Sequence, residues 1–371
     1  MGLVLPEKAD DLLPSHSDRG RSKERASRAS RRGMSVLVLV AAAAAAMLAL
    51  PIIAPAQIPE SGRTSLVKPW DSFFSVACLP SGKCYVVGTE GALLTSTDGG
   101  KNWERRAIAE RGDLSWYDLY SIRFANDGKT GWVGGESGQI LKTTDGGQTW
   151  TNQASGTTEN IFRIAVIDPQ TAYASGSNGL LMSTTDGGTH WQVQKLKSGL
   201  IFLDIAFADA QNGWTVGEFE TIMHTADGGK TWTPQMGGKR ANFKLPALFA
   251  VRFSDAQHGW VAGQGGTLLR TDNGGATWQL VTEPSTSPMY SVVFAGGTSG
   301  SAPSAVWGSG EGGALLRVGL GGAAAPTVQT PTVFDLADIA FNGQDGVAVG
   351  LGGTIVHTAD GGAHWEVVTG K

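Results

Sequence analysis

Short segments in which apolar residues alternate with other residues recur along most of the chain. Residues 120–124, Tyr-Ser-Ile-Arg-Phe, are typical. A period of two is characteristic of β-strands that bury one face. Seven copies are present, at residues 74–78, 120–124, 162–166, 203–207, 249–253, 290–294 and 337–341. The pattern therefore predicts the first strand of each of seven repeats.

Two further apolar segments follow each of these strands. The earlier one ends in glycine, at residues 85–88, 132–135, 173–176, 214–217, 260–263, 306–308 and 347–350. The later one is shorter, at residues 93–94, 140–141, 181–182, 222–223, 268–269, 315–316 and 355–356. We expect both to be strands. A fourth strand is expected to start at the tryptophan of the turn that comes next.

The third segment leads into a turn of nearly constant sequence. Residues 143–150, Thr-Thr-Asp-Gly-Gly-Gln-Thr-Trp, recur with small changes at 96–103, 184–191, 225–232, 271–278 and 358–365. A carboxylate can accept backbone N–H groups two or three residues on, and glycines permit positive φ. One carboxylate per copy favours a structural turn over a calcium loop. The predicted turn residues are Asp98, Asp145, Asp186, Asp227, Asn273 and Asp360.

The spacing of the repeats predicts the fold. Successive turn tryptophans are 47, 41, 41 and 46 residues apart, and a last gap of 87 indicates one lost copy, where residues 317–322 have neither Asp nor Trp. A period of about 40–45 residues is typical of propellers. We predict an all-β, seven-bladed β-propeller over residues 70–371, with four antiparallel strands per blade. A linear solenoid is the alternative, but it needs polar capping repeats. Ring closure is expected to rest on blade packing, helped by residues 65–70.

Charge is divided unevenly along the chain. Residues 1–33 hold eight Lys and Arg against five Asp and Glu, and residues 34–56 hold none. The totals of 29 and 33 therefore leave 21 against 28 for residues 57–371. An acidic domain is a poor match for nucleic acid. Abundant glycine beside twelve tryptophans indicates tight turns around a packed core.

Residues 1–56 have the pattern of an export signal. A basic region precedes the apolar residues 36–50, and Ala54-Pro55-Ala56 is a small-residue cleavage site. We expect cleavage after Ala56 and a lead-in at 57–69, which places the domain in a periplasm or lumen. An uncleaved membrane anchor is the alternative, and export by either the general or the twin-arginine route is open.

The two cysteines, Cys78 and Cys84, flank a predicted hairpin turn. In an oxidising compartment a disulfide is expected between them. A metal site is not expected, because no further Cys or His lies at ligand spacing. No cofactor is predicted.

Antiparallel order puts the Asp turns on one face and the inter-blade loops on the other. The second face lacks the constant turn, so it is the candidate surface for a protein partner; ordinary solvated loops are the alternative. Arg123, Arg163 and Arg252 on the first strands either line the central channel or pair with Asp204 and Asp338. The candidate partner residues are Arg105, Arg106, Trp116, Tyr117, Glu136, Arg163, Glu218, Lys239, Arg240, Phe243 and Lys244.

The turns resemble the Asp-box of the bacterial neuraminidase repeat. The fuller unit, a strand followed by Gly-Trp-Val-x-Gly, Gly-x-Ile-Leu and the Asp turn, resembles the photosystem II assembly/stability factor family over about residues 70–369. That resemblance implies an exported, non-enzymatic seven-bladed propeller that docks on a membrane protein, in photosynthetic members through an arginine patch. Only scattered arginines such as Arg163 are equivalent here.

A sialidase-like glycoside hydrolase is the alternative. Residues 162–165, Phe-Arg-Ile-Ala, resemble a sialidase Phe-Arg-Ile-Pro motif, which would direct Arg163 at a sugar carboxylate. The proline is missing, however, and the segment lies in the third repeat. Four of the five tyrosines occupy predicted core columns, which leaves Tyr117 as a nucleophile. A pair of carboxylates such as Glu136 and Glu218 stays open as a general hydrolase site.

Overall fold

The computed structural model describes residues 66–68, 70–106, 117–196, 199–238, 245–281, 287–295, 304–322 and 327–368. All of them belong to one compact unit, Glu60–Lys371. The predicted export signal at 1–56 and most of the lead-in lie outside these residues. So do five of the candidate partner residues, namely Trp116, Lys239, Arg240, Phe243 and Lys244.

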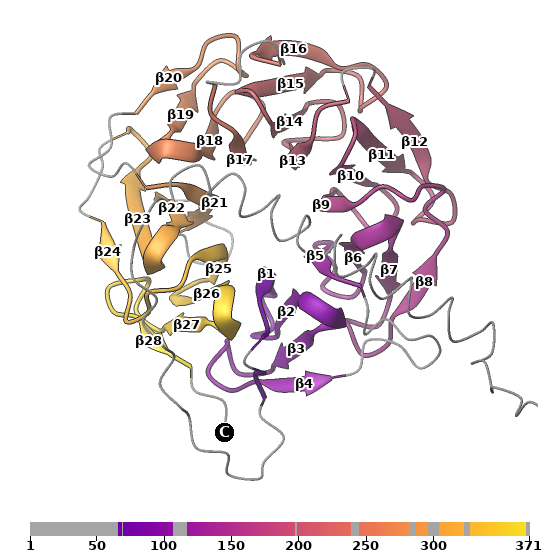
Figure 1. Ribbon diagram of the computed structural model, residues 1–371. Helices are drawn as coiled ribbons and strands as arrows, with labels where there is room; N and C mark the ends of the chain where they lie inside the picture. Colours follow the sequence, from indigo (N-terminus) through magenta and orange to yellow (C-terminus); the bar gives the residue numbers. More distant parts are fainter. Residues whose placement is uncertain are drawn as a thin grey trace, which may run out of the picture. The chain divides into compact units, whose positions relative to one another are not determined.

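The described strands form seven four-stranded antiparallel sheets, each in chain order, and the sheets are the blades of a ring (Figure 1). The predicted seven-bladed β-propeller is confirmed. First strands are β1 (Phe73–Cys78), β5 (Leu119–Phe124), β9 (Ile161–Val166), β13 (Phe202–Phe207), β17 (Leu248–Phe253), β21 (Met289–Ala295) and β25 (Leu336–Asn342). Second strands are β2 (Cys84–Gly88), β6 (Gly131–Gly135), β10 (Ala172–Gly176), β14 (Gly213–Gly217), β18 (Gly259–Gly263), β22 (Ala305–Gly310) and β26 (Asp345–Gly350).

The outer strands are shorter. Third strands are β3 (Leu93–Ser96), β7 (Ile140–Thr143), β11 (Leu180–Thr184), β15 (Thr221–Thr225), β19 (Leu268–Thr271), β23 (Ala314–Gly319) and β27 (Ile355–Thr358). Fourth strands are β4 (Glu104–Arg106), β8 (Thr151–Gln153), β12 (Gln192–Lys195), β16 (Thr233–Met236), β20 (Gln279–Leu280), β24 (Val328–Gln329) and β28 (Glu366–Val367). Where a turn tryptophan is present, the fourth strand starts one residue after it.

The sixth blade differs from the sequence-based alignment. Its second strand runs to Gly310, so Gly310 is the glycine that ends the strand, and the prediction of Gly308 was wrong. Trp307 then occupies the same place in β22 as Trp132 in β6 and Trp214 in β14.

The hydrophobic core lies between the blades. Seven clusters of buried side chains are present among the described residues, and each joins two consecutive blades. Because the chain order of blades is the ring order, each blade buries one face on its predecessor and the other on its successor. All blades can bury the apolar side chains of both faces in this way only when the ring is closed.

A repeated set of three aromatic rings fills the junctions. Between blades 4 and 5, Trp214 stacks on Phe253 with centroids 3.5 Å apart, and the turn residue Trp278 meets Phe253 edge-on at 6.0 Å. Tyr173, Phe207 and Trp232 repeat this between blades 3 and 4. The turn tryptophan therefore packs against its own first strand and, through it, the preceding blade.

The second glycine of the Asp turn is explained by the same packing. A Cβ on Gly147 would lie 2.6 Å from the ring of Tyr85 in the preceding blade, and one on Gly362 would lie 2.5 Å from Trp307. Both glycines also have positive φ. The conserved form of the turn within this chain thus reflects close contact between blades as well as backbone conformation.

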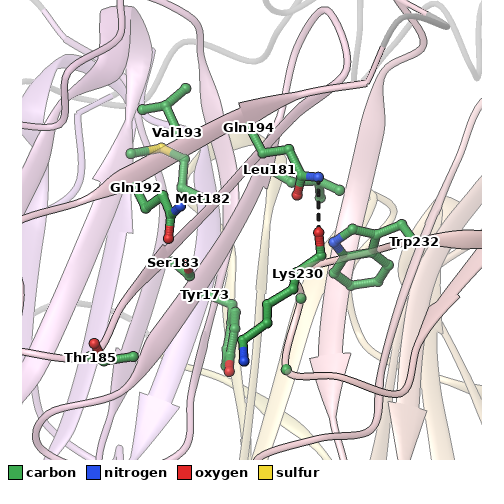
Figure 2. A pocket seen from close by; sticks show the side chains of 12 residues that line it. Tyr173, Leu181, Met182, Ser183, Thr185, Gln192, Val193, Gln194, Lys230 and Trp232 are labelled. Atoms are coloured by element: carbon green, nitrogen blue, oxygen red, sulfur yellow. Dashed lines mark hydrogen bonds between the residues drawn. The ribbon is translucent and has the colours of Figure 1, made fainter.

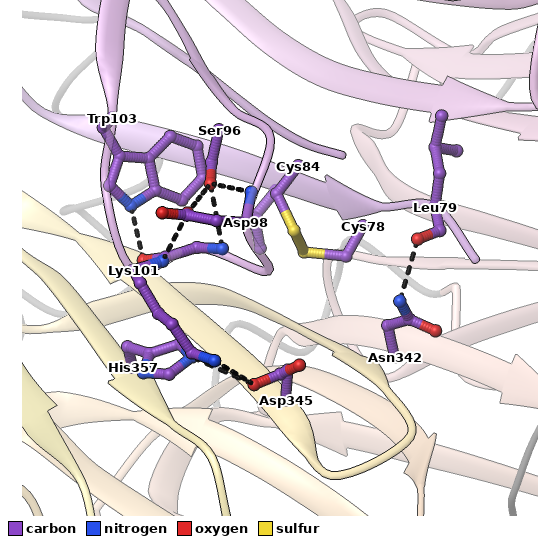
Figure 3. The surroundings of a disulfide bond; sticks show 12 residues. Cys78, Leu79, Cys84, Ser96, Asp98, Lys101, Trp103, Asn342, Asp345 and His357 are labelled. Atoms are coloured by element: carbon purple, nitrogen blue, oxygen red, sulfur yellow. Dashed lines mark hydrogen bonds and ion pairs between the residues drawn. A yellow bond between two sulfur atoms is a disulfide. The ribbon is translucent and has the colours of Figure 1, made fainter. Parts of the chain in front are cut away.

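Blade 7 meets blade 1 without a shared strand. Leu66 and Val67 pack against the cluster that joins the two blades, as the lead-in was expected to do. Asn342 Nδ2 donates to the carbonyl of Leu79 at 2.9 Å, beside the disulfide that links Cys78 and Cys84 (Figure 3). Side-chain packing and hydrogen bonds close the ring.

Candidate functional site

The Asp turns use their polar groups internally. In blade 2, Thr143 Oγ1 donates to Asp145 at 2.8 Å and accepts the N–H of Gly147 at 2.9 Å. The Asp145 carboxylate accepts the N–H groups of Gln148 and Thr149 at 2.9 and 3.0 Å. The first glycine, Gly146, donates to Lys129 O in the loop between strands one and two.

This hydrogen bonding holds the turn carboxylates ionised. Burial acts to raise the pKa of Asp145, but hydrogen bonds from Thr149, Thr143 and Gln148 outweigh it and lower the pKa to about 2. In blade 5, Asn273 Oδ1 accepts the N–H of Thr277 at 2.9 Å, so the amide closes the same turn. The polar side chains of these turns therefore hold the turn conformation.

A β-bulge interrupts the start of every first strand. The register shifts across its second residue in all seven blades. Aromatic rings at this position touch from blade to blade: Phe74 and Tyr120 have centroids 5.6 Å apart, and Tyr120 and Phe162 5.4 Å apart. The bulge places these rings around the axis, toward which the first strands face in Figure 1.

In four blades the next residue of the first strand links its blade to the following one. Its side-chain oxygen accepts a backbone N–H from that blade: Ser75 from Ile122 at 3.2 Å, Ser121 from Ile164 at 3.1 Å and Asp204 from Val251 at 2.9 Å. The carboxylate of Asp338 in blade 7 accepts the N–H of Val76 in blade 1 at 3.2 Å. The ring is therefore closed by the same contact that joins other blades.

The arginines near the axis are paired with carboxylates. Arg123 and Arg163 each lie 3.2 Å from Asp338, and Arg252 lies 2.6 Å from Asp204. Burial acts to lower the pKa of Arg163, but the carboxylates of Asp338 and Asp204 raise it. The same arginines hold the pKa of Asp338 well below its usual range, although burial opposes this. Pairing, one of the two sequence-based alternatives, is what the structure shows.

The opposite face has a repeated turn of its own, which differs from the Asp turn. After each second strand the first turn residue donates its N–H to the residue before its own first strand, as Glu136 does to Asp118 O at 2.8 Å. In blades 1, 2 and 6 the next N–H donates to a side chain of the following blade: Glu90 to Asp118 Oδ1 at 3.1 Å, Ser137 to Asn160 Oδ1 at 3.0 Å and Gly312 to Asp335 Oδ1 at 2.9 Å.

These opposite-face turns hold all five non-glycine residues with positive φ in the described chain. They are Glu90, Ser137, Asn178, Phe219 and Glu220, all in blades 1–4. Blades 5–7 have glycine at this place, as Gly265, Gly312 and Gly352. A left-handed conformation costs an ordinary residue about 1–2 kcal/mol. Blades 1–4 therefore present side chains at this place on the face, at a conformational cost that the glycines of blades 5–7 avoid.

The predicted partner residues fall into different settings. Arg163 is buried and paired at the axis. Arg105 binds Asp71 at 2.7 Å and the carbonyl of Leu66 at 3.3 Å, so it fixes the lead-in to blade 1. Its neighbour Arg106 is exposed on the outer strand β4. The structure thus pairs both Arg105 and Arg163 with buried carboxylates.

Glu136, Glu218 and Tyr117 do lie on that face. Glu136 opens the turn of blade 2. The Glu218 carboxylate accepts the N–H of Ile201 at 2.9 Å, and the Tyr117 carbonyl accepts the N–H of Gly91 at 2.8 Å. The sequence did not single out Ser137, Asn178 or Phe219. Their signal was present in the alignment of the repeats, where a glycine column changes to other residues.

A groove of about 310 Å³ opens between blades 3 and 4 (Figure 2). Tyr173, Trp232 and Met182 line it, with Lys230 at one wall. In blade 2 the residue paired with the core ring is Lys142, which covers Trp132; in blade 3 it is the small Ser183. The groove is therefore space that a long side chain fills elsewhere. Its lining holds no Asp, Glu or His.

Among the described residues, no group of three or more His, Cys, Asp or Glu side chains is placed to hold a metal ion. No helix in the described part of the chain is both long and apolar enough to cross a membrane.

Comparison with known proteins identifies the family. The family model described as photosynthesis system II assembly factor YCF48 matches residues 68–155 and 191–289, which together make up half of the chain. The chain belongs to the YCF48 family. Among curated proteins, no sequence matches the chain.

Solved structures show the same fold. A structure described as YCF48 bound to D1 peptide is 21% identical, with a TM-score of 0.62, and the alignment covers 81% of this chain and 98% of that one. YCF48 from Cyanidioschyzon merolae is 21% identical, with a TM-score of 0.61, and the alignment covers 80% of this chain and 98% of that one. An ancestral GH74 enzyme is 11% identical, with a TM-score of 0.63, and the alignment covers 82% of this chain and 47% of that one. At these identities the likeness to each structure establishes the propeller fold alone.

Proposed function

We propose that this YCF48-family protein is an exported, non-enzymatic propeller that binds a membrane protein as an assembly or accessory factor. Membership of a family described by assembly of photosystem II supports a protein partner. One similar structure is described as holding a peptide of D1. Export to a periplasm or lumen is proposed from the sequence of residues 1–56.

The partner surface is the face opposite the Asp turns, over blades 1–4. The observation that carries this choice is the set of non-glycine residues with positive φ: Glu90, Ser137, Asn178, Phe219 and Glu220. Strained backbone that surrounding contacts hold in place is often retained for function. On the Asp-turn face, in contrast, the turn carboxylates accept hydrogen bonds from the backbone of their own turns.

The chemistry of this surface suits a partner with both charges. Glu90, Glu136 and Glu220 occur in its turns, and the sequence places Lys239, Arg240 and Lys244 in the connection from blade 4 to blade 5. Phe219 adds an apolar ring. Complementary charges around an apolar centre are typical of protein interfaces and set specificity and association rate.

Affinity capture from membranes of the source organism tests the proposal. The full chain is expected to recover a membrane complex. Capture should be lost when Lys239, Arg240 and Lys244 are changed to Glu, and weakened by Glu136→Arg. The matched control is Lys129→Glu with Lys230→Glu, two exposed residues on the Asp-turn face.

Two results would contradict the proposal. One is capture that both sets of variants reduce equally, because the effect would then follow net charge instead of the face. The other is turnover of a sialoside or another glycoside by the chain that Glu136→Gln abolishes.

A further inference from the structure

Three of the six exposed large apolar residues in the described chain belong to two segments that pack against one turn of blade 7. They are Trp70, Val333 and Phe334, which are 61%, 83% and 50% exposed. They belong to two segments far apart in the sequence: the lead-in to β1 and the connection from β24 to β25. We call them the seam patch.

One turn brings the two segments together. The 3₁₀ turn η7 (Leu351–Gly353) joins β26 to β27. A Cβ on Gly352 would lie 3.0 Å from the ring of Phe334, and one on Gly353 would lie 2.0 Å from Val67 and 3.7 Å from Asp71, the neighbour of Trp70. Glycines at 352 and 353 therefore allow both segments to close on the turn. Because the turn follows a second strand, the seam patch is on the face opposite the Asp turns.

The two carboxylates next to the seam patch are engaged in hydrogen bonds, and a lysine ammonium lies beside it. The carboxylate of Asp71 is buried and bound by Arg105 and by the N–H of Lys68. Asp335 accepts the N–H of Gly312 at 2.9 Å and the hydroxyl of Tyr290 at 3.3 Å. The Lys68 ammonium lies 5.8 Å from the centre of the Trp70 ring.

Such a combination is typical of the membrane–water interface. Tryptophan has an apolar body with a polar N–H, and lysine extends an apolar stem with a charged end, so both are stable where acyl chains meet headgroups. The buried core of a protein interface is instead depleted of charged residues such as lysine.

The chain itself leads from the seam patch to an apolar segment. The first described residue is Leu66, and the apolar residues 36–50 end sixteen positions before it. Fully extended, the intervening residues 51–65 span at most about 50 Å. If residues 36–50 enter a bilayer, the part of the propeller nearest in the chain is this patch.

We infer that the seam patch rests on the surface of a lipid bilayer, with Trp70, Val333 and Phe334 in the interfacial layer. The propeller then lies with the face opposite the Asp turns toward the membrane. Blades 1–4 of the same face would meet a partner that projects from that membrane. The inference extends the proposed function, and the bilayer contact itself does not require the partner.

A polarity-sensitive fluorophore tests the contact in the full chain. Cys78 and Cys84 form a disulfide, so Val333→Cys supplies a single free thiol for labelling at an exposed site. With phosphatidylcholine vesicles, the emission of the label at 333 is expected to shift to shorter wavelength and to be quenched by spin-labelled lipid. The matched control is Lys230→Cys on the Asp-turn face, whose label should not respond.

A second pair of measurements separates this contact from anchoring by residues 36–50. Trp70→Ser with Phe334→Ser should remove the shift at 333, and in a chain cut after Ala56 should weaken binding to vesicles by roughly tenfold or more. Equal responses at 333 and 230, or none at 333 while the protein floats with the vesicles, would overturn the inference. A shift at 333 without vesicles that rises with protein concentration would assign the patch to a second copy and also overturn it. Loss of partner capture with an intact shift at 333 would count against the proposed function alone.

Discussion

In each Asp turn two side chains accept backbone N–H groups, and the two sets of N–H groups differ in their exposure to water. The carboxylate, as in Asp145, accepts exposed N–H groups, while the hydroxyl of Thr143 accepts the buried N–H of Gly147. An unsatisfied buried N–H costs more than an exposed one, which water can reach. The hydroxyl therefore matters to the turn at least as much as the aspartate that gives the motif its character.

The turn carboxylates make the free energy of unfolding depend on pH in the acid range. Hydrogen bonds hold the pKa of Asp98, Asp145, Asp186 and Asp227 at about 2, below the value of about 3.9 expected in the unfolded chain. Their contribution is thus present above about pH 4 and is lost as pH falls toward 2. We predict that Asp145→Asn flattens the decline of the urea midpoint between pH 5 and 2.

Blade 5 offers the matched control for this prediction. Asn273 closes the same turn with an amide, which does not titrate. Asn273→Asp should therefore steepen the decline over the same range. Identical slopes for the wild type and both variants would show that the turn carboxylates do not control acid sensitivity.

Some residue roles were not predictable from the sequence. Asp145 could be assigned to a turn because its partners are two to four positions away. Arg105 binds Asp71, and Arg163 binds Asp338, across many residues that only the closed ring brings together. Nothing in the sequence separates these paired arginines from Arg106, which is exposed.

The elements repeat more strictly than their sequences do. Every first strand carries a bulge and every second strand ends in the same turn, although the residues at both places vary. Period-two alternation predicted the strands, and glycine marked the strand ends. The bulge was not predictable, because the extra residue is aromatic in most blades and looks like one more apolar position, as at Tyr120 and Phe162.

The opposite-face turn allows a test of its conformational cost. A Cβ on Gly312 would meet nothing within 4 Å, so only its φ of +62° opposes a side chain. We predict that Gly312→Ala lowers the free energy of unfolding by about 1 kcal/mol. Ser137→Gly, in the equivalent turn of blade 2, should leave it unchanged or slightly raised, because relief of strain offsets the greater freedom of glycine when unfolded.

Calorimetry of the two variants decides this point. Gly265 has the same open surroundings as Gly312, so Gly265→Ala should repeat its effect. If Gly312→Ala and Gly265→Ala are both neutral, the left-handed turns of blades 1–4 carry no cost. Backbone strain would then no longer support a partner surface over blades 1–4.

The whole ring is held by contacts that cross blade boundaries, and Asp338 makes the largest set of them. Its carboxylate accepts Ser75 Oγ and Val76 N from blade 1 and Ser291 Oγ from blade 6, and it pairs with Arg123 and Arg163. Five of the seven blades therefore meet at one buried side chain. The blade count was predictable from the repeat, but this convergence was not, since Asp338 occupies an ordinary strand position.

Removal of this carboxylate should weaken the whole molecule. Asp338→Ala leaves the buried guanidinium of Arg163 and the partly buried one of Arg123 short of a counter-charge, so we predict a loss of about 3–5 kcal/mol in urea unfolding. Asp345→Ala, which removes a partly exposed carboxylate 3.7 Å from Lys101, should cost less than about 1 kcal/mol. Equal losses would mean that the axial pairs do not join the blades.

The closure of the ring has a consequence for where the chain begins. Each blade is built from one continuous stretch, and the contact from Asp338 to Val76 repeats the contact from Ser75 to Ile122. The boundary that holds the two termini is therefore joined by the same kind of contact as other blade boundaries. A circularly permuted gene that joins the present ends by a linker and opens the chain between blades 5 and 6 should still give the same ring.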